Sequence, residues 1–264
     1  MDFETLLKIE NESERVAATY EIFNEDTRLS SRAARVEFLT TLRYLEKYLL
    51  PGARVLDVGA GTGAYSVPLA EKGYAVSALE LSDANIRVFE KKLRPDLPVS
   101  LRQGNALDLS CYADASFDAV LLCGPLYHLS REEDRVRAIA EAKRVCKPDG
   151  TLFFAFIEND MVPLTELCYN PHFFTGDTYD HATFKIKDFP FVFLTLDGCR
   201  ETLRRAGIRV LHEVAADGVS ELLAYKINAM SDESYAQYLR YHFYCCEKPE
   251  MLGRSNHLLF VGKK

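Results

Sequence analysis

The stretch Val55-Leu56-Asp57-Val58-Gly59-Ala60-Gly61-Thr62-Gly63 decides the fold of this chain. Its first four residues are typical of a buried β-strand, and three glycines follow at alternate positions. A glycine-rich turn lets the backbone approach a ligand that a Cβ atom would block. The stretch therefore predicts a strand that runs directly into a binding turn for a nucleoside-bearing cofactor.

Outward from this turn, predicted strands alternate with predicted helices. The predicted strands are Arg54–Val58, Ala75–Glu80, Val99–Gln103, Phe117–Cys123, Thr151–Ile157, Ile208–Val214 and Asn256–Val261. The predicted helices between them are Tyr65–Lys72, Asp83–Leu93, Arg131–Cys146 and Asp197–Ala206. This order predicts an α/β fold with a doubly wound, mainly parallel sheet of seven strands and helices on both faces.

Three segments stand outside the repeated strand–helix order. Residues 1–50 have the pattern of an N-terminal helical arm, and we assign residues 51–264 to one binding domain. That domain carries inserts at about 158–195, which is rich in aromatic residues, and at about 219–250. Thr183–Leu196 in the first insert alternates loosely, which predicts a hairpin. Ligands of open α/β sheets bind at the carboxyl ends of the strands, so we expect the arm and the inserts to cap a site there.

Composition limits the classes of partner. The 264 residues carry a net charge of −7, so a general electrostatic grip on nucleic acid or on an anionic membrane is not expected. No apolar run is long enough to span a bilayer, and Met1-Asp2-Phe3-Glu4 lacks the basic-then-apolar order of a signal peptide. The seven cysteines are scattered, without a C-x-x-C pair, which favours reduced thiols in the cytoplasm. No H-x-x-x-H spacing is present, and we predict no metal site.

The cofactor is not decided by the turn alone. Gly59-x-Gly61-x-x-Ala64 also satisfies the fingerprint of dinucleotide-binding proteins. Glu80 closes the second predicted strand, where a carboxylate can accept hydrogen bonds from both ribose hydroxyls. Both features occur in NAD-dependent oxidoreductases as well as in other nucleoside-binding proteins, so that function stays open at this point.

Four motifs in order carry a more specific signal. They are Asp57-x-Gly59-x-Gly61-x-Gly63, Gly104-Asn105-Ala106-Leu107-Asp108, Ser116-Phe117-Asp118-Ala119-Val120 and Lys147-Pro148-Asp149-Gly150-Thr151-Leu152. Together they cover about residues 53–157 and resemble the motifs of class I S-adenosylmethionine (SAM) methyltransferases. The resemblance implies a Rossmann-like, mixed seven-stranded sheet whose last strand is antiparallel. Two positions depart from the family pattern: Asn105 replaces an Asp, and Asp149 replaces a Gly.

The resemblance also implies the cofactor contacts. For the methionine part, Asp57 would orient the amino group, the backbone of Gly59, Ala60 and Gly61 would pass close by, and Cys123 and Gly124 would lie beside the sulfonium. For the nucleoside, Glu80 would hold the ribose and Leu81 would pack on the adenine. Asn105 and Ala106 would line the adenine edge. In related enzymes an N-terminal arm folds over the cofactor. Tyr20 is therefore a candidate lid residue, and Arg28 would pair either with the methionine carboxylate or with Glu25 or Asp26.

Candidate catalytic residues follow the fourth predicted strand. Gly124-Pro125-Leu126-Tyr127-His128-Leu129 resembles a segment of a subgroup of bacterial SAM methyltransferases. His128 is either a general base near neutral pH or a brace for the loop. Tyr127 either hydrogen-bonds the acceptor or walls the cofactor pocket.

The predicted function is SAM-dependent methyl transfer to a small molecule, with S-adenosylhomocysteine (SAH) as product. The inserts are modest and aromatic, and Gly124-Pro125-Leu126-Tyr127 replaces the N-P-P-Y of enzymes that methylate amino groups of DNA bases or protein glutamine. The alternatives are a protein that binds SAM or SAH without turnover, and the oxidoreductase named above. A tyrosine stripe at helical spacing favours a packing face or a homodimer face; it comprises Tyr235, Tyr238, Tyr241 and Tyr244.

Overall fold

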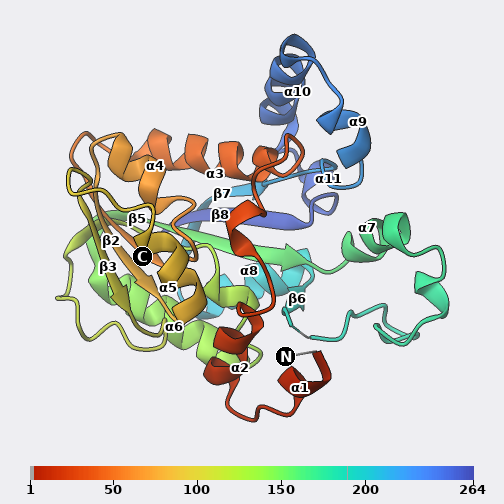
Figure 1. Cartoon of the computed structure of the whole chain (residues 1–264), viewed down its shortest axis with the longest axis horizontal. Helices are drawn as coiled ribbons and strands as arrows, with labels where there is room; N and C mark the ends of the chain where they lie inside the picture. The colour runs from red at the N-terminus through yellow and green to blue at the C-terminus, as the bar shows by residue number, and fades with distance from the viewer. Residues whose placement is uncertain (1–2, 189) are drawn as a thin grey trace.

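A mixed β-sheet forms the centre of the molecule (Figure 1). The structure is a computed structural model, and it describes residues 3–188 and 190–264. The strands are β1 Arg54–Val58, β2 Ala75–Glu80, β3 Val99–Gln103, β4 Phe117–Leu122, β5 Cys146–Glu158, β6 Phe193–Leu194, β7 Arg209–Ala215 and β8 His257–Lys263. They are ordered β3-β2-β1-β4-β5-β8-β7, with the short β6 beside β5.

The strand directions confirm the predicted doubly wound sheet. β3, β2, β1, β4 and β5 pair in parallel, whereas β8 runs antiparallel to both β5 and β7. β5 carries the fully buried Phe153, Phe154 and Phe156. The near-continuous apolar character of this strand follows from the helices that cover both faces of the sheet.

The first insert differs from its prediction. Among the described residues 183–188 and 190–196, the expected hairpin at Thr183–Leu196 is not seen. The described part of the insert has an isolated bridge, Tyr179 with Ile186, and the two-residue β6, which raises the strand number from seven to eight. Side chains replace the backbone ladder: Asn159 Oδ1 accepts from the Ile186 N–H at 2.9 Å, and Asn159 Nδ2 donates to the Phe184 carbonyl at 3.2 Å. These long-range side-chain bonds satisfy backbone groups that strand pairing would otherwise satisfy.

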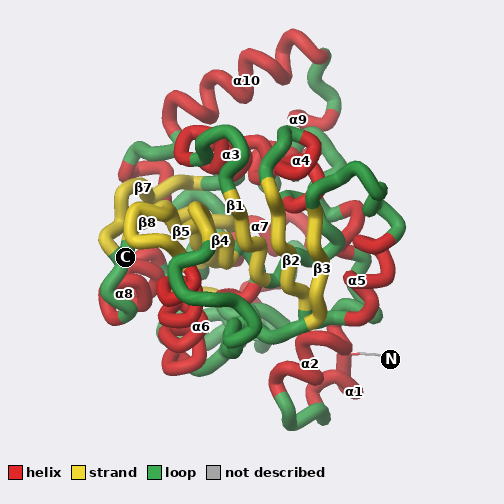
Figure 2. Tube along the Cα trace, turned by 90° about the vertical axis from the view of Figure 1, so that its left-hand side faces the viewer, coloured by secondary structure: helices red, strands yellow, loops and turns green. Residues whose placement is uncertain are grey.

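Helices cover the two faces of the sheet in two groups (Figure 2). α3, α4 and α5 pack on one face, and α6 and α8 pack on the other. The helices are α1 Phe3–Leu7, α2 Glu12–Thr19, α3 Arg35–Tyr48, α4 Ser66–Glu71, α5 Asp83–Glu90, α6 Glu132–Val145, α7 Val162–Tyr169, α8 Leu196–Arg205, α9 Ala224–Asn228, α10 Asp232–Cys245 and α11 Pro249–Leu252, with short 3₁₀ turns η1 Glu25–Thr27, η2 Pro125–Tyr127 and η3 Phe173–Thr175.

The arm and the first insert lie at the carboxyl ends of the parallel strands, whereas most of the second insert does not. α7 follows directly from the end of β5, and α1 and α2 lie below it in the same view (Figure 1). α10 instead extends from the α3 side, where Thr40 Oγ1 and His242 Nε2 lie 3.0 Å apart. Within the described part of the chain, none of the helices has the length and apolar character needed to cross a bilayer.

The tyrosine stripe is divided between packing and exposure. The Tyr235 hydroxyl donates to the Arg32 carbonyl at 2.7 Å, and the Tyr238 hydroxyl lies 2.9 Å from Ser220 Oγ. Tyr241 and Tyr244 are exposed. Two of the four tyrosines therefore anchor α10 to the rest of the chain, and the other two form its outer face.

Candidate functional site

All fourteen predicted site residues line one cleft of about 900 Å³, which we call the cofactor cleft. They come from the arm, from the ends of β1, β2 and β4, and from the loops that follow these strands and β3. The predicted residues are Tyr20, Arg28, Asp57, Gly59, Ala60, Gly61, Glu80, Leu81, Asn105, Ala106, Cys123, Gly124, Tyr127 and His128. Sequence reasoning thus selected residues that the fold brings together, while their individual roles stay predictions.

The three glycines of the turn all adopt positive φ: +72° at Gly59, +56° at Gly61 and +84° at Gly63. A Cβ on Gly59 would lie 2.8 Å from Pro125 Cδ, and one on Gly63 would lie 2.5 Å from Phe89 Cε2. Only at Gly61 would a Cβ make an ordinary contact, 3.6 Å from Glu25 Cγ. A side chain is therefore excluded at Gly59 and Gly63 because other parts of the protein pack against the turn. The sequence predicted a different reason, the close approach of a ligand.

Glu80 joins the glycine turn to the end of β2. Its Oε2 accepts from the Gly61 N–H at 2.8 Å, and its Oε1 accepts from the Ser82 N–H at 2.8 Å and from Asn85 Nδ2 at 3.3 Å. Burial raises the pKa of Glu80, and these three donors oppose that rise. Asn85 lies on α5 and was not among the predicted residues. Its position one helical turn after the strand end was the available signal.

Asp57 is buried under the same turn. The Ser66 hydroxyl donates to Asp57 Oδ2 at 2.7 Å. Burial raises the pKa of Asp57 to about 6, although the Ser66 bond works in the opposite direction. A carboxylate with so few partners of its own has acceptor capacity left for a ligand in the cleft.

Asn105 connects the loop after β3 to the arm. Its Nδ2 donates to Ser13 Oγ of α2 at 2.9 Å, and its Oδ1 accepts from the Leu107 N–H at 2.9 Å. Ser13 lines the cofactor cleft but was missed, because nothing in the sequence relates residue 13 to a loop 92 positions later.

The arm meets the loop after β4 through Tyr20 and His128. The Tyr20 hydroxyl lies 2.7 Å from His128 Nε2, and both side chains line the cofactor cleft. Burial lowers the pKa of His128 to about 4 and raises that of Tyr20 well above its ordinary value. His128 Nδ1 is buried without a hydrogen-bond partner among residues 3–188 and 190–264. A neutral, buried imidazole bound to the arm fits a brace better than a base.

Tyr127, the chain neighbour of His128, reaches back to the start of the same loop. Its hydroxyl donates to the Cys123 carbonyl at 2.7 Å, and burial raises the pKa of Tyr127. Burial also raises the pKa of the Cys123 thiol well above its usual range, so this thiol stays protonated. Gly124 lies between them, where a Cβ would stand 3.1 Å from the Gly59 carbonyl oxygen. The β4 loop is therefore held against the glycine turn.

Arg28 forms two ion pairs in the cleft wall. Its Nε lies 2.8 Å from Glu25 Oε1, a partner that the sequence offered, and its two terminal nitrogens lie 2.7 and 3.2 Å from the carboxylate oxygens of Glu37. Burial disfavours the Arg28 charge, but Glu37 and Glu25 outweigh it and raise the pKa of the guanidinium. The pair with Glu37 on α3 was missed. A methionine carboxylate would have to use the two N–H groups that these bonds leave.

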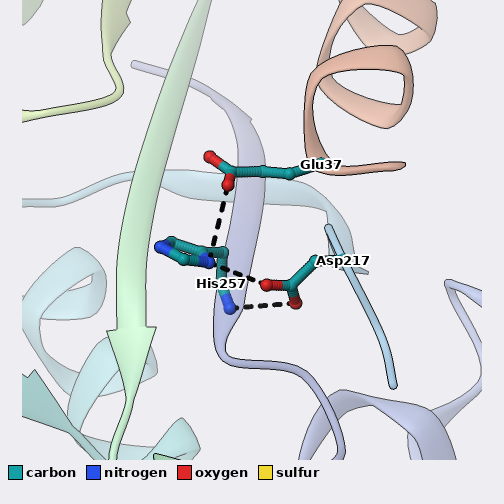
Figure 3. A group of neighbouring side chains, drawn as sticks. All are labelled: Glu37, Asp217 and His257. Atoms are coloured by element: carbon teal, nitrogen blue, oxygen red, sulfur yellow. Dashed lines mark hydrogen bonds and ion pairs between the residues drawn. The ribbon is translucent and has the colours of Figure 1, made fainter. Parts of the chain in front are cut away.

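Glu37 belongs to a further cluster with Asp217 and His257 (Figure 3). His257 Nδ1 lies 2.7 Å from Asp217 Oδ2 and 3.6 Å from Glu37 Oε2. Burial alone would lower the pKa of His257, but the two carboxylates raise it to about 9. These three side chains offer the donor types of a metal site, all within 4.8 Å of one another. A metal would have to displace the His257 proton beside the Arg28 guanidinium, so the geometry favours an ion-pair network.

A second cavity of about 780 Å³ adjoins the cofactor cleft, and we call it the side cavity. The two share Tyr20, Glu25, Arg28 and Tyr127 in their linings. The other lining residues of the side cavity are Ile157, Val162, Thr165, Glu166, Phe191, Phe193, Glu221, Asn256 and His257. Apolar walls with a few polar groups are the usual lining of a small-molecule site.

Comparisons with known proteins point to one family. The methyltransferase domain family matches residues 56–154. The cypemycin N-terminal methyltransferase of a Streptomyces species is 30% identical over 200 residues, which cover 75% of this chain and 71% of that relative. A demethylmenaquinone methyltransferase of Renibacterium salmoninarum is 42% identical over 106 residues, 40% of this chain and 42% of the relative. This chain thus spans less than half the length of that second relative.

The fold is also found in solved structures. A SAM-dependent methyltransferase of Leishmania major superposes with a TM-score of 0.61, covering 97% of this chain and 84% of that one. The two sequences are 15% identical, so this likeness concerns the fold alone.

Proposed function

The chain belongs to the class I SAM-dependent methyltransferases, and on that premise we propose that it methylates a small-molecule acceptor and releases SAH. One observation carries the proposal: the cofactor cleft and the side cavity share Tyr20, Glu25, Arg28 and Tyr127. An acceptor in the side cavity would therefore meet the methyl group at this common wall.

We assign the cofactor to the residues that line the cleft. Glu80 and Asp57 supply carboxylate oxygens for the ribose and the amino group, and Asn105 supplies an amide beside the adenine. The backbone N–H groups of Gly59 and Ala60 donate to the Leu79 carbonyl at 2.8 and 3.0 Å, so these two residues line the cleft with their N–H groups already satisfied.

The chemistry asks mainly for positioning. The acceptor's lone pair attacks the methyl carbon in line with the C–S bond, that bond breaks, and its electron pair neutralises the sulfonium. Correct orientation of reactants contributes roughly 7–11 kcal/mol to such a step. Tyr127, fixed by its bond to the Cys123 carbonyl, would wall the shared boundary. His128, with a pKa of about 4, would position Tyr20 rather than remove a proton.

Relatives do not decide the acceptor. The two relatives described above are named for demethylmenaquinone and for the N-terminus of cypemycin, which are chemically different acceptors. The side cavity of this chain supports a compact acceptor, because its apolar walls with a few polar groups are the usual lining of a small-molecule site.

Calorimetry and a transfer assay test the proposal together. SAM and SAH should bind the protein, while NAD should not, because the cleft offers partners for an amino acid and one nucleoside. With methyl-labelled SAM and a mixture of small metabolites, label should move to a small molecule and SAH should accumulate. Tight SAH binding without transfer to any acceptor would instead favour a protein that senses SAM or SAH.

A further inference from the structure

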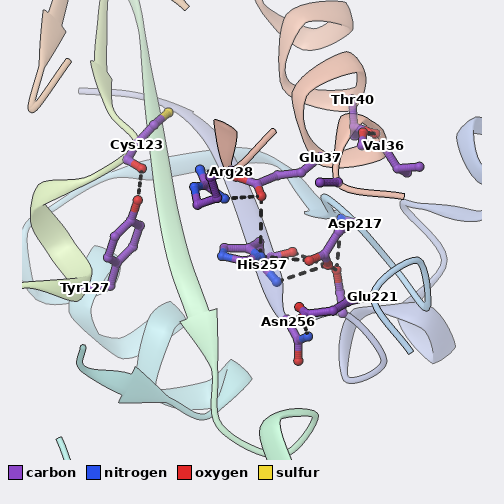
Figure 4. A network of polar contacts seen from close by, with 12 residues as sticks. Arg28, Val36, Glu37, Thr40, Cys123, Tyr127, Asp217, Glu221, Asn256 and His257 are labelled. Atoms are coloured by element: carbon purple, nitrogen blue, oxygen red, sulfur yellow. Dashed lines mark hydrogen bonds and ion pairs between the residues drawn. The ribbon is translucent and has the colours of Figure 1, made fainter. Parts of the chain in front are cut away.

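We infer that the acceptor carries a positively charged amine, which Glu166 and Glu221 hold in the side cavity. This inference rests on the proposed function, because it names the class of acceptor for the same site. Figure 4 shows Glu221 beside Asn256 and the His257 network. Glu166 lies on α7, on the wall that follows β5.

The charges that line the side cavity are unevenly compensated. Its two cations, Arg28 and His257, are already paired: Arg28 with Glu25 and Glu37, and His257 with Asp217 and Glu37. These pairs neutralise both cations within the wall itself. An anionic acceptor would therefore have to compete with Glu25, Glu37 and Asp217 for these two cations.

Glu166 and Glu221 are the carboxylates that remain. Neither carboxylate forms an ion pair in the described part of the chain. His257, whose charge acts on Glu221, is itself paired with Asp217. Glu221 Oε2 accepts from Asn256 Nδ2 at 2.6 Å, which fixes the side chain. Burial raises the pKa of Glu221 against the influence of His257. A cationic ligand would relieve that cost of burial.

The cavity supplies an independent reason to expect a ligand. It adjoins the cofactor cleft and has an apolar part formed by Ile157, Val162, Phe191 and Phe193. Phe191 stands 6.1 Å from Tyr127, ring centroid to centroid, at an interplanar angle of 74°. A lining that combines carboxylates with aromatic rings suits an amphiphilic ammonium, with the rings also offering cation–π contact.

Three matched probes test the charge preference. Phenethylamine, 2-phenylethanol and phenylacetate have similar size and differ in charge, and each is titrated calorimetrically into the full chain saturated with SAH. Phenethylamine should bind roughly tenfold more tightly than either of the other two, because charge-assisted hydrogen bonds are the stronger ones. Equal or better binding of the alcohol or the acid would overturn the inference.

Carboxamide variants locate the preference. Glu221→Gln should weaken phenethylamine binding by roughly tenfold, and the more exposed Glu166→Gln by roughly threefold, while 2-phenylethanol and SAH bind as before. Glu233→Gln, an exposed carboxylate on α10 away from the cavity, is the control. If both cavity variants keep the wild-type preference, the inference is wrong.

A failure of the proposed function can be distinguished from a failure of the charge assignment. Absence of SAH binding to the wild-type chain would contradict it, and the amine, alcohol and acid would then be compared on cofactor-free protein. A preference for the amine that depends on Glu221 would still support the charge assignment, and its absence there would overturn that assignment.

Discussion

At the scale of single residues, Glu80 shows how a predicted ribose-binding group also stabilises its own loop. Its carboxylate accepts hydrogen bonds from the N–H groups of Gly61 and Ser82. These bonds fix the direction of its remaining lone pairs, so that a ribose would meet an acceptor that needs no rearrangement. The same bonds offset part of the cost of burying the charge.

Replacement of this carboxylate should affect both SAH binding and the thermal stability of the protein. Glu80→Gln should weaken SAH binding by roughly 1.5–3 kcal/mol, because hydrogen bonds to a charged group are lost. The variant should also unfold at lower temperature without ligand, because one amide oxygen cannot replace two carboxylate oxygens. Calorimetry and thermal unfolding measure the two effects, with the exposed Glu90→Gln on α5 as control. Unchanged SAH affinity would mean that the ribose is held elsewhere.

The individual residues of the cofactor cleft were predictable where a strand end fixes them. Glu80 is the last residue of β2, Asn105 lies just beyond the end of β3 at Gln103, and parallel strands end at one edge of the sheet. Glu37 and Ser13 were not predictable, since each reaches the site from a helix whose docking angle is not encoded in local periodicity. Only the packed structure sets the 2.7 Å contact between Glu37 and Arg28.

At the scale of elements, two glycines allow the cost of backbone strain to be distinguished from the cost of a steric clash. Gly63 and Gly73 have nearly the same φ, +84° and +86°, but a Cβ on Gly73 would meet nothing within 4 Å, whereas one on Gly63 would overlap the Phe89 ring. The two positions therefore form a matched pair on either side of α4.

This pair predicts two different losses of stability. Gly73→Ala should lower the free energy of unfolding by roughly 1–2 kcal/mol, the cost of a left-handed alanine. Gly63→Ala should lower it by roughly 2–5 kcal/mol, because α5 must also move. Urea unfolding of both variants measures the difference. Equal losses would show that the packing of Phe89 on the turn adds nothing.

A double-mutant cycle can isolate the hydrogen bond between Tyr20 of the arm and His128 of the β4 loop. Tyr20→Phe and His128→Gln should each weaken SAH binding, and the double variant should lose about 1 kcal/mol less than the sum of the two. Calorimetric SAH affinities of the four proteins give this coupling. Tyr235→Phe, which removes a hydroxyl bonded to the Arg32 carbonyl, controls for loss of any tyrosine hydroxyl. Additive losses would show that the Tyr20 hydroxyl and His128 are not energetically coupled.

Elements with strong periodicity were predicted well, and the first insert was not. The βα units repeat a pattern that burial on both faces imposes, so their order can be read from the sequence. The segment after β5 has many aromatic residues but no period, and its backbone groups bond to Asn159 and Asp188. Those partners are set by tertiary structure and leave no trace in alternation.

At the scale of the whole molecule, one charged network joins distant parts of the chain. Arg28 belongs to the arm, Glu37 to α3, Asp217 to the segment after β7, and His257 to β8, the last strand. Stability and site geometry should therefore depend on the same protonation states. Arg28 lines both the cofactor cleft and the side cavity, and His257 also lines the side cavity, so the charges of the network act on both.

This network predicts how stability changes with pH. The folded-state pKa of His257, about 9, exceeds its ordinary value of 6.5, so the folded chain holds this proton more tightly. The resulting stabilisation, about 3 kcal/mol at most, is complete below pH 6.5 and is lost as pH rises through 9. His257→Gln should therefore flatten the decline of unfolding free energy between pH 6.5 and 9, measured by urea unfolding. His172→Gln, an exposed histidine of the first insert, should keep the wild-type slope. If His257→Gln also keeps it, the imidazolium does not hold the arm, α3 and β8 together.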